Sequence, residues 1–270
     1  MSKLVVSANS KKQIDSLLSK NIDGVILSIK GLAVNASFYI DVDSIFSIDF
    51  KGKEVFINLN KIMHNSDLAY LRMVMNKLKN KDVKILFYDI AVYNIAKEYN
   101  MIDKLIIHQD HLNASILSNN FYSSLGICGS YITSDITYKQ LLDIKKNSNI
   151  KIMFTVYGYE PIFYSRRYLI TNYLKYINVS DDSKKYKIVS DNGSEYPINE
   201  EEYGTTVYTP EVINLINYLD EIDSIDYFVM NSNNIIDSEF NKMVDKFINR
   251  EKMDDTYIGF FNTDTIYKVK

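Results

Sequence analysis

The sequence has one cysteine, three prolines, nine glycines and no tryptophan among its 270 residues. The single thiol, Cys128, excludes an internal disulfide and any metal site built from four thiolates, and it fits a reducing compartment. The few glycines form neither a dinucleotide-binding pattern nor a P-loop. No run of about 18 apolar residues occurs, and the apolar stretch within Met1–Ser7 is too short for a signal peptide. We therefore expect a cytoplasmic protein that has no membrane association.

The formal net charge of −3 excludes a protein whose whole surface grips nucleic acid, because neutralising phosphates requires a large basic excess. A local excess of basic residues does occur between Pro161 and Ser190, a segment that contains six Lys and Arg residues and only two Asp residues. The segment from Ile188 to Asn241 holds twelve acidic residues and neither Lys nor Arg. The basic cluster could contact RNA or a partner, and the acidic segment a basic partner subunit. Ordinary solvated faces are the alternative for both.

Short runs rich in Val, Ile, Phe and Tyr recur along the chain, separated by stretches with helical apolar spacing. Eight such runs predict strands at residues 4–7, 24–29, 55–59, 84–88, 104–108, 130–133, 151–157 and 227–230. Helical patterns between them cover residues 67–78, 91–99, 112–125 and 137–146. Because the strands are almost wholly apolar, both of their faces should be buried, as in a parallel sheet. The sequence predicts an α/β fold, a (β/α)8 TIM-type barrel in one domain over residues 1–270, with a doubly wound open sheet as the alternative.

Two segments interrupt this rhythm, at residues 31–52 and 178–209. The second contains Asn192-Gly193 between two strand-like runs, which is a strong hairpin signal. We interpret residues 178–209 as an insertion on the barrel, with a β-hairpin near residues 184–208. This insertion precedes the eighth strand and could distort the barrel.

Two stretches carry a resemblance to a known family: residues 156–173, VYGYEPIFYSRRYLITNY, and residues 196–206, YPINEEEYGTT. Weaker support comes from NLNKIMHN at 58–65 and ITSDIT at 132–137. In order and spacing, the chain resembles the U-32 (collagenase-like) peptidase family along nearly its whole length. The resemblance assigns a family hairpin to the residues Tyr196, Pro197, Glu201, Gly204 and Thr205.

The departures from this family are informative. Met153, Pro161, Arg166 and Tyr168 stand where the catalytic branch carries a Glu and Cys residues. With one cysteine, this chain cannot hold the iron–sulfur cluster of the longer relatives. It resembles the short partner of a pair linked to prephenate-dependent hydroxylation of the tRNA wobble uridine. That resemblance implies a non-catalytic or co-catalytic subunit that works with a longer, cysteine-bearing family member and contacts tRNA. A homodimer is the alternative assembly.

Two other functions stay open. The first is metal-dependent peptidase activity, for which the candidate catalytic residues are His64 and Glu160. The second is a small-molecule-binding barrel. Arg166 and Arg167 follow a strand end, where barrel ligands bind, and a guanidinium pair suits a phosphate or a dicarboxylate. Ser165, Tyr157 and Asn172 complete this candidate ligand- or RNA-binding set.

We predict no metal site in this chain, although a divalent cation held by Glu200, Glu201 and Glu202 is an alternative. His108 and His111 have no nearby third ligand in the sequence, so polar structural roles are the simpler interpretation. Cys128 lies between a helix and a strand, as a small buried hydrophobic residue would.

Overall fold

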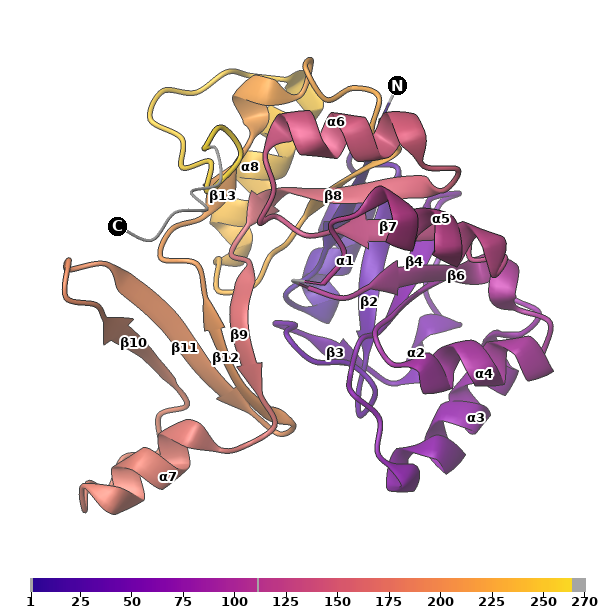
Figure 1. Ribbon diagram of the computed structural model, residues 1–270. Coiled ribbons are helices and arrows are strands. Elements are labelled where there is room, and N and C mark those ends of the chain that lie inside the picture. Colours follow the sequence, from indigo (N-terminus) through magenta and orange to yellow (C-terminus); the bar gives the residue numbers. More distant parts are fainter. Residues whose placement is uncertain (1, 111, 264–270) are drawn as a thin grey trace.

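The computed structural model describes residues 2–110 and 112–263, which fold around a closed barrel of eight parallel strands (Figure 1). The barrel closes because β1 pairs with both β2 and β14. The predicted (β/α)8 barrel is therefore confirmed, and all eight predicted strands are present. In chain order the barrel strands are β1 (Lys3–Ser7), β2 (Gly24–Ile29), β4 (Glu54–Leu59), β5 (Lys84–Phe87), β6 (Leu105–His108), β7 (Gly129–Ile132), β8 (Lys151–Gly158) and β14 (Tyr227–Met230).

The barrel has an inner and an outer apolar layer because successive strand residues point to opposite faces. Val5, Phe56 and Met153 belong to the cluster of strand residues inside the barrel. Their neighbours Val6 and Ile57 belong to the larger cluster, which includes the buried faces of the surrounding helices. Burial on both faces explains why the strands read as continuous apolar runs.

The helices follow the strands and cover the outside of the barrel. Their bounds are α1 (Lys11–Leu18), α2 (Val42–Ile45), α3 (Leu68–Leu78), α4 (Ile90–Glu98), α5 (Ile116–Ser124), α6 (Tyr138–Asn147) and α8 (Asp237–Asn249), with short 3-10 helices η1 (Asn65–Asp67), η2 (Ile102–Lys104) and η3 (Ile216–Tyr218). Thr137 caps α6 through a capping box with Gln140. The helix predicted from Leu112 starts later, because Ser115 caps it by accepting a hydrogen bond from the Ser118 amide.

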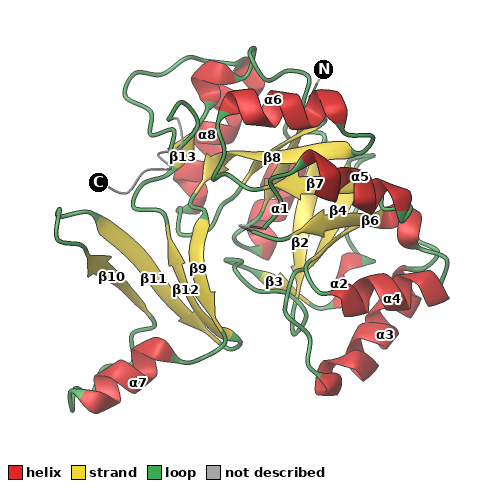
Figure 2. Ribbon diagram, viewed as in Figure 1, coloured by secondary structure: helices red, strands yellow, loops and turns green. Residues whose placement is uncertain are grey.

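A second, antiparallel sheet stands beside the barrel (Figure 2). It contains β9 (Pro161–Ser165), β10 (Lys185–Val189), β11 (Glu195–Glu201) and β12 (Gly204–Tyr208), in the order β10-β11-β12-β9, and helix α7 (Leu169–Tyr176) packs against β11 and β12. The β10–β11 hairpin confirms the Asn192-Gly193 turn signal. The sheet starts at Pro161, directly after β8, and so includes residues that precede the predicted insertion. In Figure 1, β6, β7 and β8 point toward this sheet.

Two short strands complete the main sheet. The interrupted segment 31–52 holds β3 (Tyr39–Ile40), which pairs with β2, and α2. The chain returning from the second sheet forms β13 (Ile213–Asn214), which pairs with the end of β8. Within the described ranges, no helix combines the length and the apolar character needed to span a bilayer.

Candidate functional site

A polar cavity lies at the carboxyl ends of the barrel strands, on the face that binds ligands in barrels of this type. Residues of β1, β2, β4, β5, β6 and β7, and of the segments after β2, β4, β6, β8 and β14, converge there. The residues that line it are Ser7, Ala8, Ile26, Leu27, Ser28, Asn35, Ala36, Ser37, Phe38, Asn58, Asn60, Leu86, His108, Asp110, Tyr131, Glu160, Pro161, Asn231 and Asn233. We call this cavity the barrel mouth.

Glu160 is the acidic group at the barrel mouth with the most perturbed ionisation. Its Oε1 atom accepts a hydrogen bond from Asn231 Nδ2 at 2.9 Å. Thr209 fixes its backbone, since the Thr209 amide donates to Glu160 O at 2.9 Å and the Glu160 amide donates to Thr209 Oγ1 at 3.2 Å. Burial raises the pKa of Glu160 to about 7, although hydrogen bonds from Thr155 and Asn231 oppose this rise. Near neutral pH this carboxyl can therefore both donate and accept a proton.

A chain of buried polar side chains extends from Glu160 across three strands. Thr155 on β8 shares a 2.7 Å hydrogen bond with the hydroxyl of Tyr131 on β7. The His108 ring on β6 stacks on Tyr131 with centroids 4.2 Å apart, and its Nε2 atom lies 3.7 Å from Asp110 Oδ1. Burial lowers the pKa of His108, while Asp110 opposes this shift. A neutral imidazole is therefore the expected form at pH 7.

Several asparagines form the opposite wall of the barrel mouth. Asn60 Oδ1 accepts from the Val34 amide at 2.9 Å, and Asn233 Nδ2 donates to Asn35 O at 2.6 Å. Asn58 Nδ2 donates to Ser28 Oγ at 3.2 Å. These bonds hold the amides in fixed orientations, which suits the recognition of a bound molecule.

The second sheet closes one side of the barrel mouth through contacts between distant parts of the sequence. The Thr206 hydroxyl donates to Asn35 Oδ1, and the Tyr39 hydroxyl donates to Glu201. Lys61, which is buried, lies 4.1 Å from the centre of the Tyr203 ring. These contacts fix residues of the family hairpin against the barrel.

A second hollow adjoins the barrel mouth and is mainly apolar. Asn60, Asp110 and Pro161 line both spaces. The other residues that line the second hollow are Val34, Ile62, Tyr88, Leu112, Phe163 and Tyr164. The polar barrel mouth is thus continuous with a second, largely aromatic hollow between the barrel and β9.

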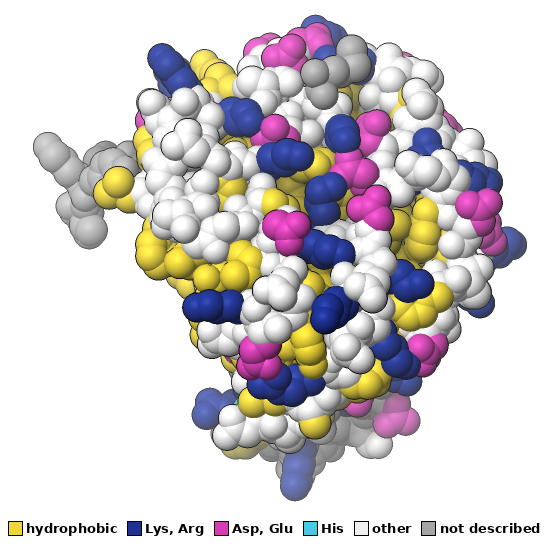
Figure 3. Space-filling model, turned by 90° about the vertical axis from the view of Figure 1, so that its right-hand side faces the viewer, with side chains coloured by type: hydrophobic (Ala, Val, Ile, Leu, Met, Phe, Trp, Pro, Cys, Tyr) yellow, Lys and Arg dark blue, Asp and Glu magenta, His cyan; other side chains and the backbone are white. Residues whose placement is uncertain are grey.

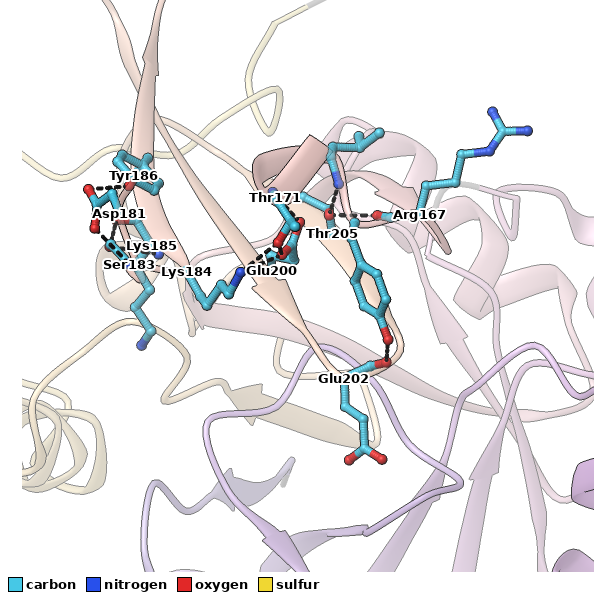
Figure 4. A network of polar contacts seen from close by, with 12 residues as sticks. Arg167, Thr171, Asp181, Ser183, Lys184, Lys185, Tyr186, Glu200, Glu202 and Thr205 are labelled. Atoms are coloured by element: carbon cyan, nitrogen blue, oxygen red, sulfur yellow. Dashed lines mark hydrogen bonds and ion pairs between the residues drawn. The ribbon is translucent and has the colours of Figure 1, made fainter. Parts of the chain in front are cut away.

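The structure separates the two candidate catalytic residues. Glu160 lines the barrel mouth, whereas His64 lies outside its lining, at the start of η1. The His64 Nδ1 atom is 3.3 Å from the Arg166 guanidinium, which is also outside the lining. The Arg167 side chain extends away from the neighbouring polar network (Figure 4). The predicted arginine pair therefore does not converge on the barrel mouth.

The remaining predicted ligand residues lie elsewhere. Tyr157 is buried against Phe240 and Phe247 of α8, with ring centroids 6.2 and 5.7 Å away. The reason is a register shift between β14 and β8, where Val229 pairs with Thr155 but Met230 pairs with Tyr157. This irregularity places Tyr157 on the outer side of the barrel.

Other members of the predicted set belong to the second sheet and α7. Asn172 is exposed on α7, and Ser165 Oγ accepts a hydrogen bond from the Arg167 amide at 3.3 Å. Thr205 Oγ1 donates to Arg167 O at 2.7 Å and accepts from the Leu169 amide at 3.0 Å. These contacts join β12 to the start of α7.

Tyr196 and Pro197 are half-buried on β11, where they pair with β10. Gly204 begins β12 with a φ of +145°, and a Cβ there would collide with the Ser165 carbonyl oxygen. The glycine of the family hairpin thus permits β12 to approach β9 closely.

The three consecutive glutamates do not share a ligand position. Glu200 accepts hydrogen bonds from the Thr171 amide at 2.9 Å and from Lys184 at 3.0 Å, whereas Glu201 binds Tyr39. Figure 4 shows the Glu202 carboxylate directed away from Glu200. Across the described ranges, no group of three His, Cys, Asp or Glu side chains is close enough to hold a metal ion.

Charged side chains outside the barrel mouth are often paired. In the basic cluster, Lys187 contacts Glu195 at 2.5 Å, and Lys184 contacts Glu200. On the barrel side turned away from the second sheet, Lys and Arg intermingle with Asp and Glu (Figure 3). That face does not mark an RNA surface by its charge.

Cys128 lies just before β7, at the opposite end of the barrel from the mouth. Its thiol donates to Leu105 O at 3.1 Å, and burial raises its pKa, so it is a poor nucleophile. His111 lies outside the described residues.

The sequence did not single out Asn231, Thr155, Tyr131 or Asn58 as site residues. One signal in the sequence could have indicated such residues: a polar residue at or just beyond the end of an apolar strand lies near the barrel mouth. Such residues are common on surfaces too, and only the closed barrel shows which of them converge.

The fold and the barrel mouth define a (β/α)8 barrel with a buried polar site at the carboxyl ends of its strands. More specifically, the chain belongs to peptidase family U32, whose family model matches residues 44–257. This confirms the resemblance found in the sequence. The chain is also 27% identical over 180 residues to a protein of Bacillus subtilis (strain 168) named tRNA hydroxylation protein P2. The match covers 64% of this chain and 58% of the length of that relative.

Proposed function

We propose that this protein takes part in the hydroxylation of tRNA, at the wobble uridine, with the barrel mouth as its working site. Membership of family U32 and the likeness to a tRNA hydroxylation protein support this role. The observation that carries it is the half-buried carboxyl of Glu160 at the barrel mouth, whose pKa of about 7 lies at the working pH of a cell. A group with this pKa at a barrel's ligand face is a candidate for proton transfer.

The role of a subunit follows from what this chain can supply. An iron–sulfur cluster requires about four thiolates, and the chain has only Cys128, which lies away from the barrel mouth. The residues present therefore do not fit such a cluster. We propose that a longer, cysteine-bearing family member is the partner, and that the present chain contributes a non-catalytic or co-catalytic barrel in the cytoplasm.

Analysis of tRNA from a strain that lacks this chain tests the role. Mass spectrometry of nucleosides should show loss of wobble hydroxyuridine, and affinity purification of the tagged protein should recover the longer relative. Full hydroxylation in the deletion strain would exclude the role in tRNA. Loss of hydroxyuridine without the partner would exclude only the assembly.

A second candidate function is a stand-alone small-molecule-binding barrel. Three buried polar atoms that have no hydrogen-bond partner within residues 2–110 and 112–263 favour it: Asn35 Nδ2, Asn58 Oδ1 and His108 Nδ1, all from residues that line the barrel mouth. Two results together would support this function over the first: the purified protein binds a metabolite, and deletion of the chain leaves tRNA hydroxylation unchanged.

A further inference from the structure

The barrel mouth has a polar lining whose hydrogen-bonding capacity is only partly used. Asn35 directs Oδ1 to Thr206 and leaves Nδ2 without a partner among the described residues. Asn58 directs Nδ2 to Ser28 and leaves Oδ1 without one. Native proteins rarely leave buried polar groups unpaired, so such groups at a ligand face indicate a missing partner. The lining can therefore offer at least one donor, Asn35 Nδ2, and one acceptor, Asn58 Oδ1, to a bound molecule.

The charges around this lining select against anions. Glu160 and Asp110 are the acidic members of the lining, and the described residues that form it include neither Lys nor Arg. His108 adds no compensating positive charge, because burial favours its neutral form. Above about pH 7, where Glu160 is ionised, a carboxylate or phosphate group entering the mouth would meet acidic side chains and neither Lys nor Arg in the described lining. Like charges about 5 Å apart in a partly screened site repel enough to weaken binding more than tenfold.

The adjoining hollow indicates the shape of the rest of the ligand. Tyr88, Phe163 and Tyr164 form aromatic parts of its walls, and it meets the barrel mouth at Asn60 and Pro161. Aromatic walls pack well against a flat ring, while the polar barrel mouth can bind a group that carries both a donor and an acceptor.

We propose that the barrel mouth binds an uncharged, ring-containing molecule that presents both a hydrogen-bond donor and an acceptor, and that it discriminates against carboxylates and phosphates. This inference rests on the proposed function only in taking the barrel mouth as the working site. The barrel mouth is separate from Arg166 and Arg167, for which the sequence predicts phosphate or dicarboxylate binding, and the preference proposed for it is the opposite one.

Matched neutral and anionic probes test this preference. Benzamide and benzoate have the same skeleton, but only benzamide is uncharged and carries a donor. Uridine and uridine 5′-monophosphate form a second, larger pair. Each would be titrated into the purified full chain with labelled Ile and Leu methyl groups, followed by NMR. Ile26 and Leu86 report on the barrel mouth, and the exposed Ile188 on β10 is the remote control.

We expect the neutral probes to shift the Ile26 and Leu86 signals saturably and to bind at least about tenfold more tightly than their anionic counterparts. Asn58→Leu, of similar size, removes the unpaired Oδ1 acceptor together with the Asn58–Ser28 hydrogen bond and should weaken neutral binding about tenfold. The exposed Asn172 provides the control Asn172→Leu, which should bind as the wild type does.

Equal or tighter binding of benzoate or uridine 5′-monophosphate would overturn the proposal, and so would the absence of saturable binding by both neutral probes. The proposal would also be overturned if benzamide left the Ile26 and Leu86 signals unchanged and a crystal soaked with benzamide held only ordered water in the barrel mouth. These outcomes are independent of tRNA. Normal hydroxylation in a deletion strain would refute the proposed function and leave a positive binding result standing.

Discussion

Replacing Glu160 with glutamine should make the protein more stable at pH 8 than the wild type. The folded chain raises the pKa of this carboxyl from 4.5 to about 7, so the folded state holds the proton more strongly than the unfolded state does. Stability contributed by the protonated group is therefore complete below pH 4.5 and is lost as the pH rises through about 7. Above that range, folding must keep a charge in a poorly solvated site.

The size of this effect follows from the pKa. A tenfold change in proton affinity corresponds to about 1.4 kcal/mol, so the rise from 4.5 to about 7 corresponds to about 3 kcal/mol. Glu160 is only half-buried and faces the barrel mouth, so solvent screening reduces this to about 2 kcal/mol. Glutamine keeps an oxygen that can accept from Asn231 and cannot ionise.

Urea unfolding at pH 5 and pH 8 measures the difference. The free energy of unfolding of Glu160→Gln minus that of the wild type should increase by about 2 kcal/mol between the two pH values. Glu202→Gln, at an exposed carboxyl, is the matched control and should show no such change. An equal difference at both pH values for Glu160→Gln would show that folding does not raise the pKa of this carboxyl.

Three further predictions concern the barrel and the second sheet. Gly204→Ala should destabilise the protein by about 2 kcal/mol, because its positive φ and the Ser165 carbonyl oxygen leave no room for a Cβ; an unchanged unfolding midpoint would contradict this. Tyr131→Phe should cost about 1 kcal/mol in thermal unfolding through loss of the bond to Thr155, and a stability gain would count against that bond. Cys128 should react slowly with a disulfide reagent at pH 8 and rapidly in urea; rapid reaction of the folded protein would show an accessible thiolate.

The barrel strands could be predicted because their residues are buried on both faces. The run Gly24–Ile29, for example, is wholly buried, so its composition alone marks it as a strand. Thr137 and the Asn192-Gly193 turn were predictable for a different reason: capping and tight turns depend on neighbouring residues.

The candidate site was harder to predict because it depends on contacts between distant segments. Nothing local shows that the register shift beside Met230 turns Tyr157 outward. The same limit applies to Glu160, which the sequence marked only as a candidate, and to Asn231, which it did not mark. Their hydrogen bond exists because the barrel brings the segments after β8 and β14 together.

The role of the barrel mouth in tRNA hydroxylation is tested by measuring hydroxyuridine at the tRNA wobble position in a deletion strain complemented with single variants. We expect restoration by the wild-type chain and by Arg167→Ala, at an exposed residue outside the lining of the barrel mouth, but not by Glu160→Ala at matched protein levels. Full restoration by Glu160→Ala would contradict the claim that the barrel mouth is the working site.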